Sequence, residues 1–197
     1  MTDDKYRVNR GKCGSLPIKD NIQSKITELL DHSTAKRKRT LATRIDIRYP
    51  ESYNAPADNS DISKVMAKFV QKNKRKGVDT DYAWSREQKA SGNQHYHVAT
   101  LEDGQKVRSG FRVKKEIEAL WASTLGVDVT GCVHYCNKSK NGEKLENGIM
   151  LDRAKPKEFD NTFGSVHHQF SYLSKEEGKG QPNDGIRDFG MSRLKKD

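Results

Sequence analysis

Two strand-like segments joined by a short polar turn dominate the middle of this 197-residue chain. Residues 80–88 (TDYAWSREQ) and 94–101 (QHYHVATL) are rich in aromatic and β-branched residues. The residues between them, 89–93 (KASGN), are of turn-forming types. The pattern predicts a β-hairpin, which favours folds built on an antiparallel sheet.

Helical and strand-like segments surround this hairpin. Apolar residues at helical spacing predict helices over residues 18–31, 60–76, 112–125 and 160–177, with Asp160 as the expected N-cap of the last. Further strands are predicted over residues 41–50, 131–136 and 148–151. This order predicts an α+β fold, in which helices pack on a mainly antiparallel sheet.

The chain divides into three expected segments. Residues 1–40 form an N-terminal polar arm and helix, in which residues 1–17 are a mobile lead-in; residues 41–178 form the main domain; and residues 179–197 form an irregular basic tail.

The charge balance favours a polyanionic partner. The chain has 37 Lys and Arg residues against 27 Asp and Glu residues, so its net charge is +10. Neutralising phosphates releases counterions and drives association, which makes nucleic acid the leading candidate. No apolar stretch reaches the roughly 18 residues that span a bilayer, and the first residues lack the apolar centre of a signal peptide. We therefore expect a cytoplasmic protein that does not bind membranes, with reduced cysteines.

The second strand of the hairpin carries two histidines that can bind a metal. His95 and His97 alternate around Tyr96, so a strand would place both imidazoles on one face. Two neutral imidazoles at this spacing suit a divalent cation. Glu87 precedes His95 by eight residues across the turn, and a hairpin can bring its carboxylate beside them. Three such ligands leave coordination positions open for water and a phosphate oxygen, as a catalytic site requires.

The last predicted helix carries a candidate nucleophile. Tyr172 lies about half a turn away from the apolar stripe of this helix, so it would point outward, with Lys175 one turn after it. A nearby ammonium group and a metal-polarised phosphate would help a phenol with a pKa of about 10 to act as a nucleophile. The same Tyr-x-x-Lys spacing occurs at Tyr135, but on a predicted strand.

Together these segments resemble the HUH endonucleases, and more closely the YagK/YfjJ-type, inovirus replication-protein family. The resemblance rests on residues 44–50 (RIDIRYP), 84–88 (WSREQ) leading into 92–97 (GNQHYH), 172–175 (YLSK) and 187–193 (RDFGMSR). It spans roughly residues 40–195. The metal motif and its surroundings are its most specific part.

The resemblance implies an HUH-type, ferredoxin- or RRM-like sheet of about five antiparallel strands, with the histidine pair at its centre and the tyrosine helix alongside. It implies Mg²⁺ or Mn²⁺ held by Glu87, His95 and His97, single-stranded DNA at a replication origin as substrate, and a covalent 5′-phosphotyrosine. In some relatives the third ligand comes from the tyrosine helix, which leaves Glu176 and His168 as rivals to Glu87.

The expected function is metal-dependent nicking and strand transfer that initiate rolling-circle replication, with Tyr172 and Lys175 as catalytic residues. The chain has no glycine-rich phosphate loop, so unwinding requires a host or element helicase. The expected contacts to the DNA backbone are basic residues, each of which can equally be a solvated surface charge: Arg44, Arg48, Lys72, Lys74, Arg75 and Arg187.

Two other functions remain open. A DNA-binding regulator that keeps the scaffold without catalysis would have the same basic charge, but it would not need an outward Tyr172 facing a metal triad. A zinc-dependent RNA-binding module would need a metal on Cys132, His134 and Cys136, which alternate along one predicted strand.

Overall fold

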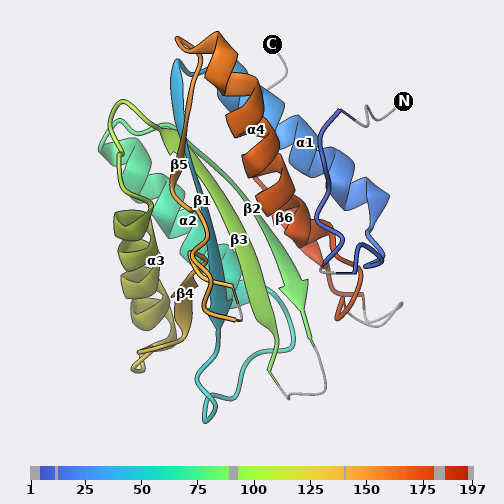
Figure 1. The fold of residues 1–197 in the computed structure, drawn as a ribbon. Coiled ribbons are helices and arrows are strands. Elements are labelled where there is room, and N and C mark those ends of the chain that lie inside the picture. The colour runs from blue at the N-terminus through green and yellow to red at the C-terminus, as the bar shows by residue number, and fades with distance from the viewer. Residues whose placement is uncertain (1–4, 12, 89–92, 140, 180–184, 195–197) are drawn as a thin grey trace.

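The computed structural model describes residues 5–11, 13–88, 93–139, 141–179 and 185–194. These residues form one antiparallel sheet with helices packed on it (Figure 1), so the predicted α+β fold is confirmed. The elements follow the chain in the order α1 (Asp20–Ala35), β1 (Arg39–Arg48), α2 (Ser60–Arg75), β2 (Thr80–Glu87), β3 (His95–Asp103), α3 (Gly110–Leu125), β4 (Val133–Tyr135), β5 (Ile149–Asp152), α4 (Pro156–Phe170), the 3₁₀ helix η1 (Ser171–Ser174) and β6 (Phe189–Met191).

The sheet has the strand order β4-β1-β3-β2-β6, and β5 pairs with the other half of β1. The predicted hairpin is present as β2 and β3, although four of its turn residues, 89–92, lie outside the described residues. Strand β3 is central, between β1 and β2. The histidine pair therefore lies on the strand whose neighbours on both sides are long and regular.

The outer edge of β1 is covered by two short strands placed end to end. Strand β5 pairs with residues 39–42 of β1, and β4 pairs with residues 45–47. Between them the side chain of Asn147 takes the place of a peptide group: the Arg44 N–H donates to Asn147 Oδ1 at 2.8 Å, and Asn147 Nδ2 donates to the Arg44 carbonyl at 2.7 Å. The hydrogen bonding of β1 thus continues across the gap.

The two faces of the sheet are covered by different helices (Figure 1). Helices α2 and α3 cover one face, where an apolar cluster includes Ile45, Val98 and the fully buried Phe69 and Trp121. Helices α1 and α4 cover the other face, where a second cluster is built around small strand residues such as Ala99. Because side chains alternate along a strand, His95 and His97 belong to the α1/α4 face and Tyr96 to the α2/α3 face.

The helix that precedes the tyrosine differs from the prediction. It begins at Pro156, so Asp160 lies within α4 and is not its N-cap; proline fits the first turn because it has no N–H to leave unpaired. The α-helix ends at Phe170, and Tyr172 lies in the tighter η1 turn. The hydroxyls of Ser171 and Ser174 donate to backbone carbonyls three residues earlier, which accompanies this tightening.

Both ends of the described chain pack against the domain. Residues 5–9, expected in the mobile lead-in, contact α4 and η1: the Tyr6 ring lies 4.8 Å from that of Phe163 in α4, and the Asn9 N–H donates to Ser171 Oγ in η1 at 2.8 Å. Ile18 forms a β-bridge with Lys175. Strand β6 lies in the expected irregular tail and pairs with β2. None of the helices in the described part of the chain is long and apolar enough to cross a membrane.

Candidate metal centre and tyrosine site

The register of three adjacent strands positions the side chains of the candidate metal centre. Glu87, the last residue of β2, pairs with His95 at the start of β3. On the other side of β3, Asp46 of β1 pairs with His97. Paired residues place their side chains on the same face, so all four converge on the α1/α4 face at one end of the sheet.

Glu87, His95 and His97 form a cluster that could hold a metal ion, with one ligand atom from each residue and all three atoms within 4.8 Å of one another. Glu87 Oε2 lies 2.7 Å from His97 Nε2 and 3.2 Å from His95 Nε2. Two imidazole nitrogens and a carboxylate oxygen form a donor set that suits a divalent cation. The predicted choice of Glu87 as the carboxylate therefore agrees with its placement beside both histidines.

Glu87 is buried, yet its environment favours the ionised form. Burial alone would raise the pKa of its carboxyl group. Hydrogen bonds to both histidines and the charge of Lys175 outweigh burial and hold the pKa well below its usual range. The carboxylate is therefore available as an anionic ligand at neutral pH.

Asp46 is a further residue at the candidate site, which the sequence did not single out. Its Oδ1 lies 2.7 Å from His97 Nδ1, so it orients the imidazole through the nitrogen that faces away from Glu87. Burial would raise the pKa of Asp46, but the charges of Arg44 and His97 hold it below the usual range. The alternation of Arg44 and Asp46 along β1 was visible in the sequence, whereas the pairing with His97 depends on strand register.

Tyr172 lies directly beside this cluster. Its ring packs edge-on against that of His97, with 5.0 Å between ring centroids, and the Arg44 guanidinium lies 4.0 Å from the ring centroid. Lys175 Nζ lies 3.4 Å from the phenol oxygen and 3.2 Å from Glu87 Oε1. The buried Lys175 thus links the tyrosine to the carboxylate of the candidate metal centre.

The cluster and the tyrosine line a cavity of about 790 Å³, which also has an aromatic wall. Tyr49 and Tyr53 both line the cavity, and their rings stack with the ring planes 7° apart. A second lysine, Lys179, lies near Glu87; burial, only partly opposed by the charge of Glu87, lowers its pKa to about 8. The cavity is therefore lined by aromatic, basic and acidic side chains together.

Three of the six predicted DNA contacts lie near the candidate metal centre, and the other three lie at the end of α2. Arg44 and Arg48 are at the site: Arg44 stacks on Tyr172, and the exposed Arg48 pairs with His95 across the strands. Arg187 is exposed and precedes Asp188, whose carbonyl accepts from the Arg86 N–H near the same end of β2.

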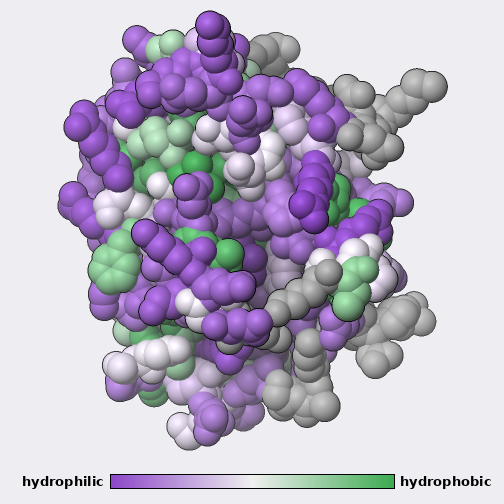
Figure 2. Space-filling model, in the orientation of Figure 1, coloured by the Kyte–Doolittle hydropathy of each residue, from purple (hydrophilic) through white to green (hydrophobic). Residues whose placement is uncertain are grey.

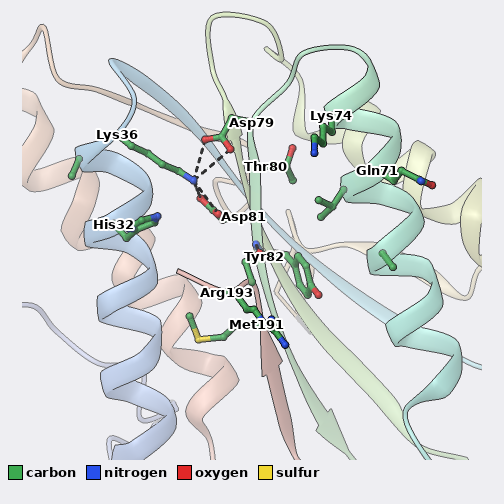
Figure 3. Close-up of a pocket in the computed structure, with 14 residues that line it drawn as sticks. His32, Lys36, Gln71, Lys74, Asp79, Thr80, Asp81, Tyr82, Met191 and Arg193 are labelled. Carbon is green, nitrogen blue, oxygen red and sulfur yellow. Dashed lines mark hydrogen bonds and ion pairs between the residues drawn. The ribbon is translucent and has the colours of Figure 1, made fainter. Parts of the chain in front are cut away.

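The other three predicted contacts, Lys72, Lys74 and Arg75, are at the end of α2. Lys74 borders a cavity of about 900 Å³ between α1 and α2, together with Thr80 at the start of β2 (Figure 3). Thr80 and Glu87 are the two ends of β2, about 23 Å apart at 3.3 Å per residue. These basic residues are therefore remote from the metal centre, and Lys72 is paired with Glu116.

The rival ligands lie apart from the histidine pair. Glu176 is exposed, and His168 lines a different cavity on α4. In the described ranges, Cys132, His134 and Cys136 form no group that could hold a metal, and burial raises the pKa of the Cys136 thiol. Tyr135, the other Tyr-x-x-Lys tyrosine, lies in β4 with its ring against Phe111.

The fold and these side chains define a class: an α+β protein with a candidate Glu-His-His metal centre beside a tyrosine and a lysine. Residues 16–192 match the family described as YagK/YfjJ C-terminal domain, and the chain belongs to that family. A comparison with curated proteins finds no match.

Proposed function

We propose that this protein nicks single-stranded DNA at a replication origin and transfers the strand through a covalent 5′-phosphotyrosine, which initiates rolling-circle replication. One observation carries the proposal: the phenol of Tyr172 lies beside the metal-ligand cluster and within reach of Lys175. Metal-assisted attack on a phosphodiester requires a nucleophile beside the metal, and the half-buried Tyr172 has this position.

The chain's own residues supply the covalent chemistry. The Tyr172 oxygen would form a bond to phosphorus, and the bond from phosphorus to the 3′ oxygen would break. The phenol loses its proton, and the departing 3′ oxygen gains one and becomes a hydroxyl. Lys175 would stabilise the phenolate as it forms, because its ammonium group lies 3.4 Å from that oxygen.

Glu87, His95 and His97 would hold Mg²⁺ or Mn²⁺. When bound, such a cation polarises the scissile phosphate and offsets developing negative charge. Asp46 fixes the orientation of the His97 ring, and Arg44 holds the plane of the Tyr172 ring. These two residues are positioning residues in the proposed reaction.

The polar surface supports binding to a phosphodiester backbone. The side of the molecule in Figure 2 is mostly hydrophilic, with hydrophobic residues confined to small patches. The net charge of +10 and the exposed Arg48 at the cavity favour DNA entering this end of the sheet. A helicase from the host or the element would supply unwinding.

The decisive experiment incubates the protein with a varied pool of single-stranded oligonucleotides and Mn²⁺ and looks for a covalent protein–DNA band. We expect Tyr172→Phe to abolish the band while DNA binding persists, because it removes one hydroxyl and keeps the ring. Tyr135→Phe is the matched control and should form the adduct normally. An adduct mapped to Tyr135, or unimpaired nicking by Tyr172→Phe, would overturn the assignment.

The main alternative is a DNA-binding regulator that keeps the scaffold without catalysis. If the wild-type protein binds single strands but forms no adduct with any divalent metal across the pool, the regulator becomes the better explanation.

The choice of carboxylate ligand has its own test. Glu87→Gln should weaken Mn²⁺ binding measured by calorimetry, because it removes the anionic ligand between the two histidines. Glu176→Gln should leave binding unchanged, since Glu176 is exposed and is not part of the cluster. A larger loss of Mn²⁺ affinity in Glu176→Gln than in Glu87→Gln would show that Glu176, and not Glu87, is the carboxylate ligand.

A further inference from the structure

A second cavity, of about 590 Å³, adjoins the tyrosine site. It lies between the N-terminal segment, α4 and the loop before β5, and we call it the α4 cavity. Arg44 connects the two sites: it lines the α4 cavity, and its guanidinium lies on the ring of Tyr172. A strand bound at the tyrosine would therefore have a neighbouring nucleotide at the α4 cavity.

One residue that lines the α4 cavity carries a buried acceptor that the described chain does not satisfy. Gln169 lies three residues before Tyr172 and lines the cavity. Its Nε2 donates to the Glu146 carbonyl at 2.8 Å, which fixes the orientation of the amide. Its Oε1 is buried and has no hydrogen-bond partner in the described residues.

Arg44 adds an unsatisfied donor to the same cavity. Its guanidinium reaches Asp46 through Nη2 at 3.4 Å, but its buried Nε has no partner in the described part of the chain. Buried polar atoms without partners are rare in folded proteins, and a ligand is one explanation for them. An acceptor from Gln169 and a donor from Arg44 in one cavity suggest a ligand with both kinds of group.

The chemistry of these atoms selects the ligand. A phosphodiester has only acceptors, so it cannot satisfy Gln169 Oε1. A nucleobase with an exocyclic amino group offers a donor next to a ring acceptor. Leu145 and Ile149 also line the cavity and provide apolar surface for the flat faces of a base.

We propose that the α4 cavity binds a nucleobase that carries an exocyclic amino group, next to the phosphate that the protein cleaves. Gln169 would accept from the amino group, and Arg44 Nε would donate to the base. This inference rests on the proposed function, because it places the base beside a strand bound at Tyr172. It makes Gln169 a specificity-determining residue.

The test measures binding alone. Oligodeoxycytidine and oligodeoxyuridine of equal length are compared by fluorescence anisotropy on the Tyr172→Phe protein, which has no nucleophile and so keeps the strands intact. The two bases differ at the amino group, where uracil has an oxygen that repels an acceptor, and at the adjacent ring nitrogen, which accepts in cytosine and carries a hydrogen in uracil. We expect oligodeoxycytidine to bind about 2- to 10-fold more tightly, the net worth of one hydrogen bond.

A second substitution locates the preference. Gln169→Met keeps the length of the side chain and removes the amide, so it should weaken binding to oligodeoxycytidine. Binding to oligodeoxyuridine should not weaken, because the substitution removes the acceptor that the uracil oxygen repels. Gln71→Met, at an exposed glutamine of α2, is the matched control and should preserve the preference. Equal binding of the two oligonucleotides, or a preference that survives Gln169→Met, would overturn the proposal.

The two hypotheses fail separately. A chain that forms no tyrosine adduct but loses its cytosine preference in Gln169→Met would refute nicking and keep the base site. A chain that nicks normally and shows no cytosine preference that depends on Gln169 would keep the nicking function and refute the base site.

Discussion

The two faces of the central strand differ sharply in what they bury. On the α2/α3 face, Tyr96 and Val98 pack into a continuous apolar cluster. On the α1/α4 face, His95 and His97 of the same strand lie beside the carboxyl groups of Glu87 and Asp46. The α2/α3 face does contain one buried carboxyl, Glu102, but burial raises its pKa to about 8, so it is mostly neutral at pH 7.

The difference shows how a folded domain can contain a cluster of buried ionised groups, although burying such groups lowers its stability. Burying ionised groups is unfavourable unless they are paired, and the metal end of the α1/α4 face concentrates several of them. The apolar cluster on the opposite face of the same strands stabilises the register that brings Glu87 and Asp46 to the histidines. We therefore expect substitutions on one face to change activity and those on the other to change stability.

The largest effect should come from the metal end. His95→Ala/His97→Ala should abolish divalent-cation binding and cleavage, because two of the three ligands are lost. Salt-sensitive DNA affinity should largely remain, since phosphate contacts come from the basic surface. Calorimetry with Mn²⁺ and anisotropy at several salt concentrations test this, and undiminished Mn²⁺ binding would rule out the site.

The opposite face should respond through stability. Phe69→Ala removes a fully buried ring and should lower the free energy of unfolding by about 3–5 kcal/mol. Phe111 is 53% exposed, so Phe111→Ala is the matched control and should change stability by no more than about 0.5 kcal/mol. Urea unfolding measures both. If the folded fraction of Phe69→Ala also loses Mn²⁺ affinity, the two faces are not separable.

A smaller effect should follow from the residue that orients His97. Asp46→Asn keeps the shape of the side chain but removes its charge, and should weaken metal binding about 10- to 100-fold. Asp31→Asn, at an exposed position of α1, should have no effect. Metal titration of both variants checks the expectation, which an unchanged affinity in Asp46→Asn would contradict.

The smallest effect concerns charges on the α1/α4 side at the other end of the sheet. Arg37 and Lys36 bind Asp79 and Asp81 there, and Figure 3 shows the lysine contacts. Burial would raise the pKa of Asp79, but Arg37 and Lys36 lower it overall. Because Asp79 is half exposed, Asp79→Asn should cost no more than about 1 kcal/mol at pH 7.

The sign of the pH dependence follows from the lowered pKa. The unfolded carboxyl has a pKa of about 3.9, so the contribution of Asp79 is present above about pH 4 and is lost as the pH falls further. The difference between wild type and Asp79→Asn should therefore vanish in acid unfolding measurements. A loss of Mn²⁺ affinity in this variant would show that both ends of the face belong to one functional unit.

Local patterns in the sequence predicted most elements and the cluster of side chains that could hold a metal. Alternation placed His95 and His97 on one face, and the hairpin placed Glu87 near them. Features that depend on tertiary contacts were missed: β6 has only three residues and exists through pairing with β2, and Asp46 meets His97 through the register of β1 and β3. The predicted start of α4 was wrong because aspartate is a common N-cap residue, yet Asp160 lies inside a helix that begins at Pro156.

The amide of Asn147 allows the length of the segment between β4 and β5 to change. Since this one side chain completes the ladder of β1 between β4 and β5, the segment linking the two strands does not have to supply backbone groups at that point. Relatives could lengthen or shorten that segment without disturbing Arg44, provided the asparagine is kept. A labelling tag or an additional recognition module could be inserted at the exposed residues 141–143, which lie outside the lining of the α4 cavity, while the nucleophile stays in place.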